Sequence, residues 1–79
     1  MTEKYTETQG RYLAYIYYYT KVNGIAPSHA DITNYFGVTP PTVNSMLKTL
    51  CDRALLTREP KVARSLKVTL TPKELPLIW

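Results

Sequence analysis

Apolar residues recur with helical spacing near the start of the chain, and the flanking residues mark where the helix begins and ends. Thr6 and Gln9 have the spacing of a capping box, and Asn23-Gly24 is a usual C-terminal stop signal. A helix over residues 7–22 is therefore predicted. It has an aliphatic face and a tyrosine-rich face, and we expect the aliphatic face to form the core.

Two more helices are predicted to follow closely. Ser28 opens a second sequence of capping-box form, which predicts a helix over residues 29–36 that ends at Gly37. The third helix, over residues 40–52, starts with two prolines after Thr39, which is a suitable N-cap residue. The first turn tolerates proline because its N–H groups have no partner inside the helix. A short helix, a glycine turn and a second helix are typical of a helix-turn-helix.

The third predicted helix separates apolar from polar positions. Residues at one helical spacing are apolar: Val43, Met46, Leu47 and Leu50. Residues on the opposite face are small, polar or basic: Pro41, Asn44, Ser45 and Lys48. Because residues 38–50 contain no Asp or Glu, the outward face of this helix can approach an anionic partner without repulsion.

After the third helix the spacing changes from helical to alternating. Residues 66–70, LKVTL, alternate apolar and polar side chains, and residues 55–58, LLTR, also favour a strand. Pro60 excludes a helix through the basic segment between them, so residues 55–70 are predicted to form a β-hairpin. We therefore predict a mainly α fold with a small β-hairpin: a winged helix-turn-helix with a three-helix core, a two-stranded wing and an apolar tail at residues 71–79.

Composition limits the possible functions. The 79 residues are expected to form a single domain, residues 1–79, and the net charge of +4 favours an anionic partner such as nucleic acid. One histidine and one cysteine supply no catalytic constellation and no metal site, so we predict neither an enzyme nor a cofactor. No stretch has the length of a membrane span or the form of a signal peptide, so we expect a cytoplasmic location.

The sequence resembles the winged helix-turn-helix DNA-binding domains of bacterial and archaeal transcription regulators over about residues 11–72. GIAPSHADIT, residues 24–33, is similar to the G-x-P-P-T/S-x-A-E/D-I stretch that opens the second helix of LexA DNA-binding domains. GVTPPTVNSMLKTLCDRALL, residues 37–56, is more similar to the MarR and iron-dependent-repressor kind. VTLTP, residues 68–72, resembles the last wing strand of those families. The resemblance implies a regulator of transcription, a repressor, that binds double-stranded DNA.

Some features of those families have no counterpart in the sequence. It contains no LexA protease domain, so we expect no self-cleavage. It also lacks the long flanking helices of MarR proteins and the metal ligands of iron-dependent repressors. We therefore expect neither a bound metal nor a small-molecule effector.

In folds of this kind the third helix enters the major groove and the wing contacts backbone or minor groove nearby. Asn44 is expected to recognise adenine through its amide, and Thr42 or Pro41 to contact a thymine methyl. Basic wing residues bind phosphate or enter a narrow minor groove, and Ser28 presents its hydroxyl to a phosphate. The predicted DNA-binding residues are Ser28, Thr39, Pro40, Pro41, Thr42, Asn44, Ser45, Lys48, Arg58, Lys61, Arg64 and Lys67.

The tyrosine-rich face of the first helix, which we call the tyrosine stripe, consists of Tyr15, Tyr18, Tyr19 and Val22. An exposed aromatic patch is typical of an interface, so a homodimer through the stripe and the C-terminal tail is predicted. The predicted dimer-interface residues are Tyr15, Tyr18, Tyr19, Val22, Leu77 and Trp79. Alternatively, the tyrosines form a half-exposed rim of the core.

Two functions fit these patterns. The leading one is a sequence-specific, DNA-binding transcription regulator, which the basic hairpin and the acid-free third helix favour. The alternative is a winged helix that acts as a protein–protein interaction module in a larger assembly, which the tyrosine stripe and the apolar tail favour.

Overall fold

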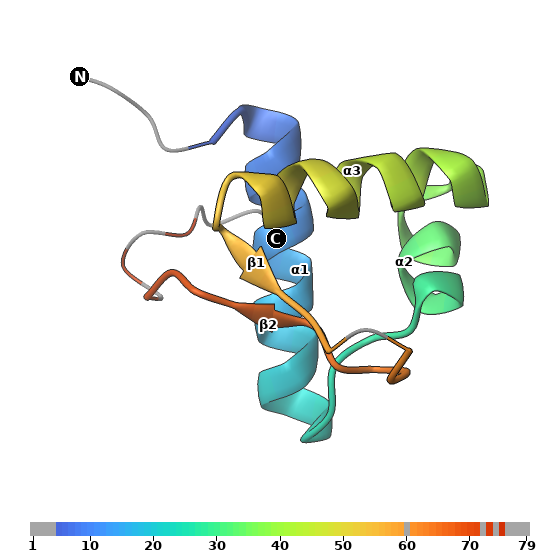
Figure 1. The fold of residues 1–79 in the computed structure, drawn as a ribbon. Coiled ribbons are helices and arrows are strands. Elements are labelled where there is room, and N and C mark those ends of the chain that lie inside the picture. The colour runs from blue at the N-terminus through green and yellow to red at the C-terminus, as the bar shows by residue number, and fades with distance from the viewer. Residues whose placement is uncertain (1–4, 60, 72, 74, 76–79) are drawn as a thin grey trace.

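The structure is a computed structural model that describes residues 5–59, 61–71, 73 and 75. It consists of three helices followed by two antiparallel strands: α1 (Glu7–Asn23), α2 (His29–Phe36), α3 (Pro40–Asp52), β1 (Leu56–Thr57) and β2 (Lys67–Val68). In Figure 1, α1 runs behind the hairpin, α3 crosses above it, and a tight turn joins α2 to α3. This order confirms the winged helix-turn-helix that the sequence predicts.

Both capping boxes predicted from the sequence are formed. At the start of α1 the Thr6 hydroxyl accepts from the Gln9 backbone N–H at 3.2 Å, and the Gln9 side chain accepts from the Thr6 N–H at 3.0 Å. Ser28 and Asp31 make the same reciprocal pair at the start of α2, at 3.1 and 3.0 Å. These bonds satisfy N–H groups that the first turn of a helix leaves without a partner.

The start of α3 is stabilised differently from the sequence expectation. Thr39 occupies the cap position with extended backbone, but its side chain makes no cap hydrogen bond. Its hydroxyl lies 2.9 Å from the Thr42 hydroxyl instead. Since Pro40 and Pro41 hold the first two helical positions and have no N–H, fewer donors need a cap here. The position of the helix start is confirmed, whereas the expected capping bond is not formed.

The core lies where the three helices meet the hairpin. Its fully buried side chains include Leu13 and Ile16 of α1, Ile32 of α2 and Leu47 of α3. Burial of such a side chain contributes roughly 1.5–3 kcal/mol. The predicted aliphatic face of α1 therefore does form the core, while Met46 of α3 is only partly buried at its edge.

The tyrosine stripe is not the exposed patch that the sequence predicts. Tyr15 is only 9% exposed, and its ring stacks on Tyr35 at a centroid distance of 4.2 Å and meets Phe36 edge-on at 5.7 Å. The expected exposure of Tyr15 is thus wrong, because α2 packs against this side of α1. The other two tyrosines of the stripe are half-buried, and Val22 alone in it is largely exposed, at 82%. Two further predicted interface residues lie outside the described residues: Leu77 and Trp79.

The hairpin is shorter than predicted, with two residues in each strand. Leu56 pairs with Val68 and Thr57 with Lys67. Buried leucines just outside the strands attach the hairpin to the core: Leu55, Leu66 and Leu70. We call the described residues between the strands, 58–59 and 61–66, the wing loop. None of the helices in the part of the chain that the structure describes is long and apolar enough to cross a membrane.

Candidate nucleic-acid interface

The predicted contact residues of α3 all lie on its exposed side: Thr39, Pro40, Pro41, Thr42, Asn44, Ser45 and Lys48. The opposite side of the helix is anchored by Val43, Leu47 and Leu50, none of which is accessible to solvent. Since these three side chains fix the rotation of α3 about its own axis, the core itself determines which residues of the helix face outward.

The outer face of α3 has the chemistry of a base-reading surface. Most of its side chains are small and uncharged, and among the described residues no hydrogen bond occupies the Asn44 amide, which offers both a donor and an acceptor. Lys48 adds a positive charge one turn further on. The acid-free surface ends at Asp52, which is exposed in the last turn.

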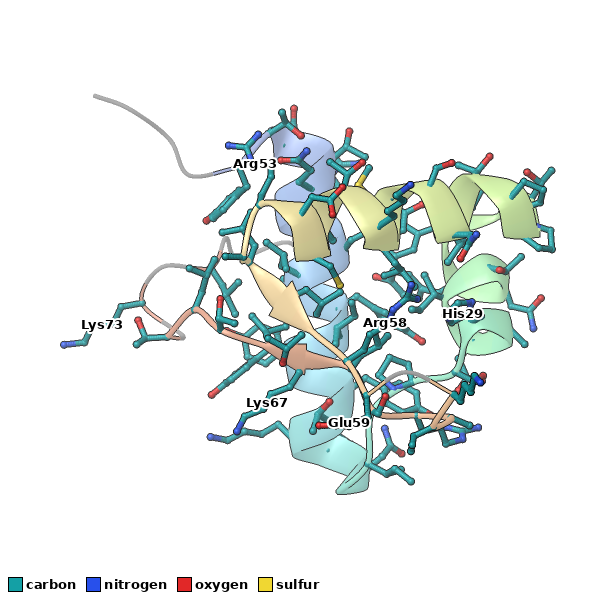
Figure 2. The ribbon with its side chains drawn as sticks, in the orientation of Figure 1. His29, Arg53, Arg58, Glu59, Lys67 and Lys73 are labelled. Atoms are coloured by element: carbon teal, nitrogen blue, oxygen red, sulfur yellow. The ribbon has the colours of Figure 1, made fainter. Side chains whose placement is uncertain are left out.

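The wing loop brings three basic residues and one acid, Glu59, to the start of α2. A shallow pocket between these segments is lined by Ser28, His29, Arg58 and Lys61, among others. Figure 2 shows His29 and Arg58 in the region between α3 and the wing loop. Four of the predicted phosphate ligands are thus brought together at the start of α2: Ser28, Arg58, Lys61 and Arg64.

Lys67 is separated from that group. It belongs to β2, and in Figure 2 its side chain extends away from α3, as does that of Lys73. All four basic residues of the hairpin are predicted from the sequence to contact DNA. The structure instead places Lys67 on the other side of the hairpin from Arg58.

Arg64 has partners within the protein that the sequence does not predict. Its Nη1 lies 3.1 Å from Asp31 Oδ2 and donates to the Ala26 carbonyl at 3.3 Å and to the Tyr19 hydroxyl at 3.5 Å. The Tyr19 hydroxyl in turn donates to Asp31 at 3.1 Å. We call these four residues the Arg64 cluster; the phosphate contact predicted for Arg64 competes with all of these bonds.

The charges of the Arg64 cluster stabilise one another. The backbone N–H of Ser28 is the main reason that the pKa of Asp31 lies below its ordinary value, and hydroxyl hydrogen bonds and the Arg64 charge act in the same direction. The hydrogen bond with Tyr19 and the charge of Asp31 raise the pKa of Arg64. Both groups are therefore charged at neutral pH, and together they add no net charge to the surface.

The described residues hold no group of three or more His, Cys, Asp or Glu side chains arranged to bind a metal ion. What the geometry provides is a helix whose exposed outer face carries Lys48 and no acid over residues 39–51, beside a short hairpin with more basic than acidic residues. These features, together with the helix-turn-helix, define a winged helix-turn-helix DNA-binding domain.

Comparison with known proteins identifies the family. The model of the LexA DNA binding domain matches residues 2–65, and the chain belongs to this family. It is also similar to a LexA repressor from Thermosipho melanesiensis (strain DSM 12029 / CIP 104789 / BI429), with 35% identity over 66 residues, which are 84% of this chain and 33% of the relative. The chain therefore spans about a third of the length of that relative.

Proposed function

We propose that this domain binds double-stranded DNA sequence-specifically and represses transcription, with α3 in the major groove and the wing on the adjoining backbone or minor groove. The observation that carries the proposal is the exposed outer face of α3, which has no acidic residue over 39–51. Arg58 and Lys61 of the wing add positive charge at the start of α2, the other helix of the helix-turn-helix. The relative is named a LexA repressor, which supports repression, and membership of the LexA DNA-binding domain family supports DNA binding. Such a protein acts in the compartment that holds DNA, the cytoplasm of a bacterium.

Base recognition in this proposal depends on the first two turns of α3. Asn44 is suited to pair with the N6 and N7 atoms of adenine, since its amide both donates and accepts. Pro41, Thr42 and Ser45 are small enough for the helix backbone to come close to the base edges. Pro41 and Thr42 can also contact a thymine methyl.

Phosphate binding falls to Lys48, Arg58 and Lys61, with Ser28 as a neutral donor. Each neutralised phosphate contributes about −0.9 to the slope of log affinity against log salt. Three cations predict a slope of about −3 for one domain. If Arg64 and Lys67 also bound phosphate, as the sequence alone suggests, the slope would be roughly −4 to −5.

A homodimer is part of this proposal, but the exposed apolar surface that supports it is smaller than the whole tyrosine stripe. With Tyr15 buried, the exposed apolar side chains near the end of α1 are Val22 and Ile25. Dimerisation through this region suits a palindromic operator, as in other helix-turn-helix proteins. Light scattering at high micromolar concentration tests it: a mass of 9.1 kDa would exclude the dimer and leave the DNA-binding proposal intact.

The experiment that tests the proposed function begins with selection of bound duplexes from a random pool. Fluorescence anisotropy of the selected duplex at several salt concentrations then gives affinity and slope, with Asn44→Ala as the test variant. Lys67→Ala is the matched control, because it removes a charge away from the proposed surface. Equal binding by wild type and Asn44→Ala would contradict the proposal, and failure to select any duplex would favour the protein-interaction alternative.

A further inference from the structure

The wing loop has little intrinsic support for its conformation. The strands that carry it have two residues each, and a two-stranded hairpin is marginally stable by itself. Lys61 and Arg64 have left-handed backbones, with φ of 65° and 55°, which side chains with a Cβ disfavour. Val62 is 58% exposed, so apolar packing at this point does not hold the loop.

Hydrogen bonds inside the loop define its shape without attaching it to the rest of the domain. The Ser65 hydroxyl accepts from the Glu59 N–H at 2.9 Å and lies within bonding distance of the carbonyls of Glu59 and Val62, at 3.2 and 2.9 Å. All of these partners belong to the loop. Leu66 buries the end of the loop next to β2 in the core, so a separate interaction is needed only to fix the rest of the loop beside α2.

The Arg64 cluster supplies that interaction. The guanidinium of the loop residue reaches Tyr19 of α1, Ala26 of the α1–α2 connection and Asp31 of α2. Asp31 is itself held by the Ser28 N–H and the Tyr19 hydroxyl, so the acceptor is fixed before the arginine binds it. All three contacts are made by one guanidinium nitrogen, Nη1, at the far end of the arginine side chain, which reaches one bond further from the backbone than a lysine ammonium.

We propose that Arg64 is a positioning residue for DNA binding: it fastens the wing loop to α1 and α2 and so holds Arg58 and Lys61 at the start of α2, on the proposed DNA-binding surface. This inference rests on the proposed function. It means that Arg64 places the phosphate ligands and is not itself a phosphate ligand. The phosphates that the wing binds are then contacted by Arg58 and Lys61 alone.

The test compares Arg64→Ala, Arg64→Lys and Asp31→Asn in anisotropy titrations of the selected duplex. Positioning predicts that all three variants bind about tenfold more weakly, because lysine keeps the charge but is one bond too short to reach the same acceptors, and Asp31→Asn removes the charge that anchors Arg64. The salt slope should also fall in magnitude by about 2, since both wing phosphates are lost together. Circular dichroism confirms that each variant is folded, and Tyr19→Phe, which changes no charge, provides a milder disruption of the same cluster.

A direct phosphate contact predicts the opposite pattern. Arg64→Lys would then keep near wild-type affinity, and Asp31→Asn would bind more tightly because it removes a negative charge and frees Arg64. The salt slope of Arg64→Ala would fall by only about 0.9. Either the tighter binding of Asp31→Asn or the rescue by lysine would overturn the inference.

Hydrogen exchange on the free protein separates this inference from the proposed function. The Val62 N–H, which donates to the Glu59 carbonyl at 3.1 Å, should exchange faster in Arg64→Ala than in wild type. The Gly37 N–H, which donates to Thr33 in the helix-turn-helix, serves as the internal control and should not change. Unchanged exchange at Val62 would overturn the anchoring role whatever the DNA titrations show. A wild type that binds no duplex would instead refute the proposed function.

Discussion

The two halves of the proposed interface, α3 and the wing loop, are held in place by different forces. α3 is fixed by Val43, Leu47 and Leu50, which are completely buried. The wing loop is fixed by polar bonds around Arg64, whose side chain is 37% exposed. Apolar burial is not weakened by charge screening, whereas an exposed ion pair weakens as salt rises.

Because of this difference, mutations in the two halves should have different consequences. Reading a base edge requires a helix placed to within fractions of an ångström, and a close-packed core provides that rigidity. Phosphate contact tolerates more movement, and a wing attached through polar bonds can be loosened without unfolding the domain. We therefore expect changes beneath α3 to reduce stability, and changes on the exposed surface to reduce affinity.

The largest effect is expected beneath α3. Leu47→Ala leaves a cavity in the core and should lower the free energy of unfolding by about 2–5 kcal/mol, measured by denaturant titration. Met46→Ala is the matched control on the same helix, because Met46 is only partly buried and its loss should cost clearly less. Equal losses for the two variants would contradict the burial difference on which the comparison depends.

On the outer face of the same helix, Asn44→Ala should leave stability within about 0.5 kcal/mol of wild type, as for most exposed substitutions. The affinity for the selected duplex should fall by about 1–3 kcal/mol, and preference at the base pair read by the amide should be lost. Competition with duplexes altered at single positions measures both. A uniform loss across all sequences would show that Asn44 contacts the backbone instead.

A smaller effect is expected at the two helix starts of the helix-turn-helix. Ser28→Ala removes a formed capping bond and should cost about 1 kcal/mol. Thr39→Ala should cost less, because the Thr39 side chain makes no cap hydrogen bond. Denaturant titrations of both variants measure the two losses in the free energy of unfolding. A larger loss for Thr39→Ala would mean that the contact between the Thr39 and Thr42 hydroxyls stabilises α3 more than the capping bond of Ser28 stabilises α2.

The most gradual change is expected with pH. Because hydrogen bonds lower the pKa of Asp31 in the folded protein, its stabilising contribution is present above the ordinary value of 3.8 and is lost as the pH falls through the lower, folded value. The melting temperatures of wild type and Asp31→Asn should therefore differ at neutral pH and converge below about pH 4. Curves that stay parallel down to acid pH would show that the Asp31 charge does not stabilise the fold.

The sequence determined the elements whose signals are local. The capping boxes at Thr6 and Ser28, the stop at Gly24 and the two prolines of α3 act within four residues, and the predicted helix ends lie within one residue of those observed. In the same way, the helical spacing of the apolar residues of α3 predicted which of its residues face outward. A pattern of this kind needs no knowledge of what the helix packs against.

Only the tertiary structure decided which side chains are left free at the surface. Tyr15 is buried because α2 covers that side of α1, and Arg64 meets Tyr19, 45 positions earlier, because the hairpin folds back on the helices. Lys67 is separated from Arg58 by the geometry of the hairpin. The helical period and the number of charges show only where a side chain lies on its own helix or strand. Its partners depend on how elements that are distant in the sequence approach one another.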